Sequence, residues 1–141
     1  MADGEQASLL YLIKRLELAV RKRLDAVVAP AGLTVVQYTA LTALERHPGM
    51  TAAALARHSF VAAQTTAELV RGLEARGLIV REPDPASRRQ TPISLTEAGR
   101  SLLDGLREPV AAIERSMLAE RQTRRQDAAT TLEAMRRALE S

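Results

Sequence analysis

The chain has 141 residues, of which 46% are hydrophobic and 26% are charged, and its formal net charge is +3 at pH 7. This length suits one domain with its own core, and this composition excludes a chain that is disordered throughout. Cysteine is absent, which excludes disulfides, thiolate zinc sites and cysteine redox switches. The positive excess is mild, so it permits a nucleic-acid partner without requiring one.

Targeting and membrane segments are not predicted. Residues 1–7 contain acids and lead into a charged helix, unlike the basic and then apolar layout of a secretory signal. Lys and Arg interrupt every apolar run before it reaches the roughly 20 residues that a membrane span needs. The basic residues at 14–15 and 21–23 alternate with acids, which favours a solvated helix face over a membrane-binding surface. We therefore expect a cytoplasmic protein without a membrane partner.

The first half of the chain reads as a series of helices. Apolar residues at three- and four-residue steps predict an amphipathic helix over 8–29, which Pro30-Ala31-Gly32 ends. Thr34-Val35-Val36-Gln37 matches a capping box and opens a second predicted helix over 34–46.

Two shorter helices follow. After the break at His47-Pro48-Gly49, Thr51 can cap a third helix that ends near His58. A fourth helix is predicted from about Ala62 to Arg76, with Gly77 in the C-cap position. Two short helices joined by a tight turn are therefore expected.

A hairpin with a basic tip comes next. Residues 78–82 and 91–95 are rich in branched apolar side chains, and 83–90 carries turn residues and two arginines between them. Because Pro92 has no N–H to donate, the returning strand should lie at an edge or start late.

The C-terminal part is again helical. Thr96 can cap a fifth helix, in which Gly105 and Pro109 invite a bend, and a last helix is predicted over about 123–139. This last helix is expected to bury three apolar side chains, those of Leu132, Met135 and Leu139. The fold class is therefore mainly α with a small β-hairpin wing. The apolar faces of the terminal helices exceed what a small central domain can cover, which predicts a dimer.

This order of elements is typical of a winged helix-turn-helix, in which the helix after the turn enters the major groove and the hairpin follows the DNA backbone. Short polar side chains near the start of that helix can reach base edges while its backbone lies close to the duplex. Gln64, Thr65 and Thr66 are such residues.

Three stretches resemble the MarR family of regulators, and the similarity runs from about Leu9 to the C-terminal helix. They are Leu55-Ala56, then Thr65-Thr66 with Leu69-Val70 and Leu73-Glu74-Ala75-Arg76-Gly77-Leu78, then Asp84-Pro85-Ala86-Ser87-Arg88-Arg89 followed by Leu95-Thr96-Glu97-Ala98-Gly99. The third stretch is the most specific, because an acidic-proline, double-arginine turn followed by Leu-Thr-x-x-Gly is hard to obtain by chance.

The resemblance implies a winged helix-turn-helix with N- and C-terminal dimerisation helices. The dimerisation helices of a homodimer would lie in 1–33 and 101–141, and 34–100 would form the winged helix-turn-helix DNA-binding domain. The three parts together would make one compact domain overall. Such a dimer would act as a repressor on a palindromic operator, with half-sites about 10 bp apart.

The resemblance also assigns roles in the wing. Arg88 matches the position whose guanidinium enters the minor groove, Asp84 the position that holds it in place, and Arg89 is expected to touch phosphate. An ordinary solvated turn is the alternative interpretation of these arginines. The complete set of expected DNA-binding residues is Gln64, Thr65, Thr66, Glu68, Arg71, Asp84, Arg88 and Arg89.

Three positions depart from the family pattern. Glu68 occupies a recognition-helix position where a basic residue is frequent, Ala62 lies where a capping Ser is typical, and Ser87 replaces a second acid in the wing. Glu68 could accept a hydrogen bond from a cytosine amino group, or it could simply face solvent.

Members of the family often bind small aromatic or phenolic anions in a cleft between the dimerisation helices and the DNA-binding domain. Tyr11, Arg15 and Tyr38 are the candidate residues for such a ligand, with ordinary helix packing as the alternative. An effector of this kind would release DNA by changing the spacing of the two recognition helices.

Other classes of function have little support in the sequence. No Gly-rich phosphate loop or Gly-x-Ser-x-Gly elbow occurs, so we expect neither an enzyme nor a cofactor. His47 and His58 lack a clustered set of partner ligands, so no metal site is predicted. The remaining alternative is a winged module for protein assembly without specific DNA reading. Salt dependence separates the two, because phosphate contacts release counterions and apolar interfaces do not.

Overall fold

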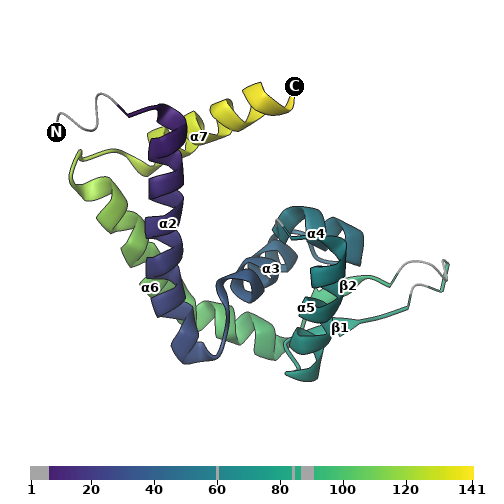
Figure 1. Ribbon diagram of the computed structural model, residues 1–141. Helices are drawn as coiled ribbons and strands as arrows, with labels where there is room; N and C mark the ends of the chain where they lie inside the picture. The colour runs from purple at the N-terminus through teal and green to yellow at the C-terminus, as the bar shows by residue number, and fades with distance from the viewer. Residues whose placement is uncertain (1–6, 60, 84, 87–90) are drawn as a thin grey trace. The chain divides into compact units, whose positions relative to one another are not determined.

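The computed structural model describes residues 7–59, 61–83, 85–86 and 91–141. Figure 1 shows a mainly helical chain with one two-stranded hairpin, which confirms the predicted fold class. The elements are α2 (Leu9–Val28), η1 (Ala29–Ala31), α3 (Val35–Arg46), α4 (Ala52–Ser59), α5 (Ala63–Ala75), β1 (Ile79–Arg81), β2 (Ile93–Leu95), α6 (Glu97–Ala119) and α7 (Arg125–Glu140).

The chain divides into two compact units, Met1–Arg107 and Glu108–Ser141, so the boundary falls inside α6. The first unit contains α2, η1, α3, α4, α5, the hairpin and the first part of α6. The division into 1–33, 34–100 and 101–141 expected from the sequence is a functional one and stays a prediction.

Side-chain caps begin several helices of the first unit where the sequence predicts them. The capping box is confirmed, because Thr34 Oγ1 accepts from the Gln37 N–H at 3.1 Å and Gln37 Oε1 accepts from the Thr34 N–H at 2.9 Å. Thr51 Oγ1 accepts from Ala54 N at 3.2 Å, and Thr96 Oγ1 accepts from Gly99 N at 3.1 Å. Each bond satisfies an N–H that the helix itself leaves without a partner.

Two glycines end helices in the left-handed region. Gly77 has φ +73°, its N–H donates to Glu74 O, and the next N–H, of Leu78, donates to Leu73 O. This pair of bonds is a Schellman motif, so Gly77 stands one position after the helix cap, which is Arg76. Gly32, with φ +77°, ends η1 with the same pattern.

The hairpin is antiparallel, with Ile79 opposite Leu95 and Arg81 opposite Ile93. β2 begins directly after Pro92, as expected for a residue without an N–H, although the Pro92 carbonyl still accepts from Glu82 N at 3.1 Å. Ile93 also bridges to Met50, which joins the segment between α3 and α4 to the wing.

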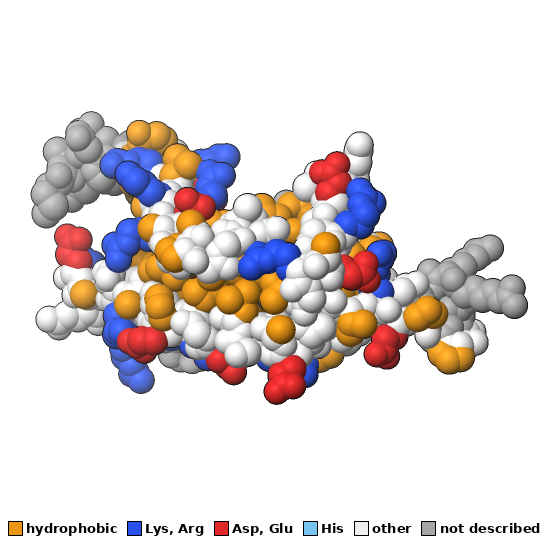
Figure 2. Space-filling view, turned by 90° about the horizontal axis from the view of Figure 1, so that it is seen from below, with side chains coloured by type: hydrophobic (Ala, Val, Ile, Leu, Met, Phe, Trp, Pro, Cys, Tyr) orange, Lys and Arg blue, Asp and Glu red, His pale blue; other side chains and the backbone are white. Residues whose placement is uncertain are grey.

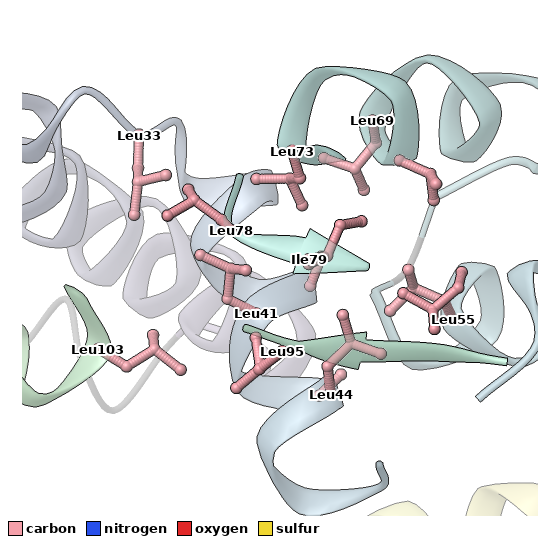
Figure 3. Close-up of a cluster of buried hydrophobic side chains, with 14 of the residues drawn as sticks. Leu33, Leu41, Leu44, Leu55, Leu69, Leu73, Leu78, Ile79, Leu95 and Leu103 are labelled. Carbon is pink, nitrogen blue, oxygen red and sulfur yellow. The ribbon is translucent and has the colours of Figure 1, made fainter. Parts of the chain in front are cut away.

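The core of the first unit lies between α3, α4, α5 and the hairpin. Figure 3 shows its leucine and isoleucine side chains pointing toward one another from these elements. The largest side chains with less than 2% exposure are those of Leu41, Leu44, Leu55, Leu73, Ile79, Ile93, Val28, Val70 and Thr66. This core is what holds α5 in place.

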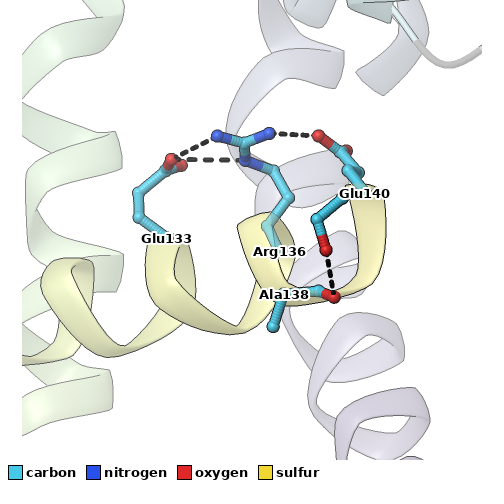
Figure 4. A network of polar contacts seen from close by, with 5 residues as sticks. Glu133, Arg136, Ala138 and Glu140 are labelled. Atoms are coloured by element: carbon cyan, nitrogen blue, oxygen red, sulfur yellow. Dashed lines mark hydrogen bonds and ion pairs between the residues drawn. The ribbon is translucent and has the colours of Figure 1, made fainter.

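The second unit contains the end of α6 and all of α7. Arg125 and Glu114 form an ion pair between them, with Nε and Oε2 2.8 Å apart. Within α7, Arg136 bonds to both Glu133 and Glu140, as the dashed lines in Figure 4 show. These pairs are exposed and contribute little to stability, because water screens them.

The burial predicted for the last helix is wrong for the single chain. No residue of α7 is buried, and Leu132, Met135 and Leu139 are 56%, 39% and 86% exposed. The periodicity identified an apolar face correctly, but that face needs something to cover it.

No single helix of the described residues is long and apolar enough to cross a bilayer. Leu9–Ala31 and Val35–Arg46 reach such a length and composition only together, with a bend of 84° between them.

Candidate nucleic-acid interface

The helix-turn-helix consists of α4 and α5, and α5 lies alongside the hairpin (Figure 1). The buried positions of α5 follow helical periodicity and are Thr66, Leu69, Val70 and Leu73. Because these side chains anchor α5 in the core, its opposite face must point to solvent.

That opposite face carries four of the expected DNA-binding residues. Gln64, Thr65, Glu68 and Arg71 are all exposed, and Gln64, Glu68 and Arg71 recur at steps of four and three along one side of the helix. Among the described residues none of the four has a side-chain hydrogen bond or ion pair. Their polar groups are therefore open to an external partner.

Thr66 does not belong to this face. Its side chain is 1% exposed, and its hydroxyl donates to the Ala62 carbonyl at 3.0 Å. This burial corrects the expected base contact of Thr66. The spacing of Thr66 from Leu69, Val70 and Leu73 is the signal that could have revealed it, because residues three, four and seven apart share one helix face.

Ala62 occupies the N-cap of α5 in an extended conformation, with φ −68° and ψ 153°, and makes no side-chain cap bond. The helix nevertheless begins there, because the Ala62 carbonyl accepts its first backbone hydrogen bond from Thr66 N at 3.0 Å. The missing cap leaves amide donors at the N-terminus of α5, and such donors can bind phosphate.

The expected wing contacts Asp84, Arg88 and Arg89 lie outside the described residues. The described base of the wing is joined to α5 by Arg81 of β1. Arg81 Nη2 lies 2.8 Å from Glu74 Oε1, and Arg81 Nε donates to Glu74 Oε2 at 3.2 Å. These hydrogen bonds lower the pKa of Glu74 and raise that of Arg81, because each bond favours the charged form of both partners. Sequence reasoning did not find this pair.

The three residues expected to bind an effector do not share one environment. Tyr11 is 57% exposed on α2, and Arg15 Cζ lies 5.8 Å from the centre of its ring. Tyr38 is half-buried on α3 and packs against the core. Elsewhere in this unit, a hollow of about 510 Å³ is bordered by Arg76, Leu78 and the first turns of α6.

The two histidines come together at the end of α3 and the end of α4. Their ring centres lie 4.8 Å apart, with an angle of 36° between the rings. Within residues 7–59, 61–83, 85–86 and 91–141, no three His, Cys, Asp or Glu side chains are grouped as metal ligands.

A short helix, a tight connection, a second helix with a polar outer face and an adjoining hairpin together define a winged helix-turn-helix protein. Residues 31–90 match the sequence pattern of the MarR family. The HTH-type transcriptional repressor Rv2887 of Mycobacterium tuberculosis (strain ATCC 25618 / H37Rv) is 34% identical over 119 residues, which are 84% of this chain and 86% of that protein. The chain therefore belongs to the MarR family of transcriptional regulators.

Solved structures agree with this assignment. The transcriptional repressor CouR bound to a 23-mer DNA duplex matches with a TM-score of 0.77 and 29% identity, over 95% of this chain and 93% of that chain. The complex of Rv2887 with salicylic acid matches with a TM-score of 0.71 and 29% identity, over 96% of this chain and 98% of that chain. The winged helix-turn-helix fold predicted from the sequence is thus confirmed.

Proposed function

We propose that this protein represses transcription as a homodimer that binds a palindromic operator. The observation that carries the proposal is the outer face of α5, where Gln64, Thr65, Glu68 and Arg71 are exposed without partners among the described residues. Side chains of this kind on a helix that fits the major groove can donate to and accept from base edges. The similarity to CouR, which was solved on a DNA duplex, supports the same function. Such a regulator would act in the cytoplasm.

The dimer follows from the apolar surface of the terminal helices. Leu9, Ile13 and Leu16, which share one face of α2, are 72%, 49% and 48% exposed, and α7 has no buried residue. Figure 2 shows hydrophobic side chains at the surface among charged ones. Since an isolated helix of this length is marginal in water, α7 needs packing to stay folded. A second copy of the chain, joined through 1–33 and 101–141, would supply it.

Selection of bound sequences from random duplex DNA by the purified protein tests this function. We expect enrichment of a palindrome whose half-sites lie about 10 bp apart, one for each α5 of the dimer. Binding to it should weaken steeply between 50 and 200 mM salt, by a factor of about 10³ or more if at least six phosphates are contacted. No enrichment, together with salt-insensitive self-association, would instead favour a protein-assembly module.

The wing supplies a prediction for one side chain. We expect Arg88→Ala to weaken binding to the selected operator by about 1–3 kcal/mol, because the guanidinium would leave the minor groove. Gel-shift titration at fixed salt measures this loss, with Arg46→Ala as a control that removes one exposed positive charge from α3. Equal affinities of the Arg88 variant and the unmodified protein would show that Arg88 does not contact the operator.

We also propose that a small aromatic anion releases the protein from DNA. Rv2887 was crystallised with salicylic acid, and here Arg15 lies beside the Tyr11 ring, where a guanidinium and an aromatic face are available together. Titrating salicylate into the protein–operator complex is expected to lower the bound fraction, and Arg15→Ala is expected to reduce that response. A bound fraction that stays constant across a broad panel of aromatic acids would reject the ligand switch.

A further inference from the structure

One arginine joins the recognition helix to the N-terminal helix. Arg76, the C-cap residue of α5, donates from Nη1 to the Gly32 carbonyl at 2.6 Å and from Nη2 to the Ala31 carbonyl at 3.2 Å. These partners are 44 and 45 residues away in sequence. Among the residues that the structure describes, no other hydrogen bond is made between α5 with its cap and the segment from α2 to Gly32.

The chemistry of this contact suits a rigid connection. The carbonyls at the end of a helix lack helical N–H partners and carry partial negative charge, so a guanidinium fork satisfies them well. Both sides are also held by their own backbone. Arg76 is fixed between the last turn of α5 and the left-handed Gly77, and Gly32 is itself left-handed at the end of η1.

The guanidinium lies directly against Gly32. A Cβ added at Gly32 would stand 3.2 Å from Arg76 Nη2 and 3.6 Å from Arg76 Cζ. A side chain at Gly32 would therefore press on the guanidinium, and the left-handed φ of +77° at this position would be strained for any residue other than glycine.

We propose that Arg76 is a positioning residue for DNA binding. It holds the C-terminal end of α5 against the end of the N-terminal helix and so sets the separation of the two recognition helices in a dimer. This inference rests on the proposed function, because the separation matters only for a dimer that reads two half-sites. Loss of the contact would let each α5 shift relative to the helix that joins it to the partner copy.

The consequence is a preference for one half-site spacing. Inserting one base pair between half-sites moves them apart by about 3.4 Å and rotates them by about 35°. A dimer with fixed recognition helices should discriminate strongly against this change, and a dimer with loosened helices should discriminate weakly. A purely structural role for Arg76 would instead lower the affinity for every spacing by the same factor.

The test uses the full-length protein and the selected operator, with one base pair inserted or deleted between its half-sites. We expect the unmodified protein to lose about tenfold or more in affinity when the spacing changes. We expect Arg76→Ala to lose about threefold or less, and Arg76→Lys, which keeps a cation near the two carbonyls, to lie between them. The spacing ratio is the affinity for the selected operator divided by the affinity for the operator with altered spacing. Arg46→Ala removes the same charge from another exposed site, and its spacing ratio should equal that of the unmodified protein.

Equal spacing ratios for Arg76→Ala and the unmodified protein would overturn the positioning role, whatever happens to the absolute affinity. Thermal unfolding of each variant, read beside the ratios, shows whether lost stability accompanies the change. If Arg76→Ala does not fold, the spacing ratio of Arg76→Lys is compared with that of Arg46→Ala instead. Equal ratios for these two variants would again overturn the positioning role. If the unmodified protein selects no operator at all, the proposed function fails, and the positioning role fails with it.

Discussion

Replacing Gly99 with alanine is expected to lower the free energy of unfolding of the first unit, which contains the wing, by about 3 kcal/mol or more. Gly99 lies in the first turn of α6, and a Cβ there would stand 2.3 Å from the Leu78 carbonyl oxygen and 3.3 Å from Leu95 Cδ2. The carbonyl cannot move away freely, because it accepts from Thr96 N at 3.1 Å next to the start of β1. The methyl group therefore forces α6 away from the wing.

The same helix offers a control of opposite sign. A Cβ on Gly105 meets no atom within 4 Å, and Gly105 lies in the interior of α6, so Gly105→Ala is expected to stabilise the protein by about 0.5–1 kcal/mol. Urea unfolding followed by circular dichroism measures both changes. The steric argument would be refuted by a Gly99→Ala protein as stable as the unmodified one.

The second large effect concerns the dimer. Changing Leu132 and Leu139 together to glutamate is expected to weaken self-association by at least about 3 kcal/mol, more than a hundredfold in the dissociation constant. Both side chains lie on one face of α7 and are exposed in the single chain, at 56% and 86%. Charges there would have to be desolvated when a second copy covers the face.

Sedimentation equilibrium of the double variant measures this change, and its operator affinity should fall in parallel. The matched control is Thr130→Glu with Ala134→Glu, which adds two carboxylates on the opposite, exposed side of α7. If both double variants remain dimeric at the same concentrations, the apolar face of α7 is not the dimer interface.

Features that depend on a few neighbouring residues were predictable. The capping box at Thr34 and Gln37, the helix end near Gly77 and the late start of β2 after Pro92 all follow from groups within about four residues of one another. Local sterics and hydrogen bonding decide such features before the chain is compact. The order of helices and hairpin could be inferred for the same reason, whereas the family was inferred from the resemblance of three stretches of sequence.

Side-chain contacts between different elements were not predictable. Arg76 meets Gly32 and Ala31, 44 and 45 residues away, and Arg81 of β1 meets Glu74 of α5, because the core sets the angle at which α5 packs against its neighbours. Many other arginines and glutamates of this chain have the same local surroundings. Nothing in their spacing shows which of them will come together.

The recognition helix illustrates this difference. The sequence by itself determined that a winged helix-turn-helix forms and that α5 carries short polar residues near its start. The spacing of Thr66 from the buried leucines and valine of α5 already indicates that it shares their face. Only the tertiary structure decided that this face packs into the core, which leaves Thr66 1% exposed while Gln64 and Thr65 face solvent. The physical reason is that composition and propensity choose a helix, but the rotation of that helix about its axis is chosen by the packing of Leu69, Val70 and Leu73 into the core.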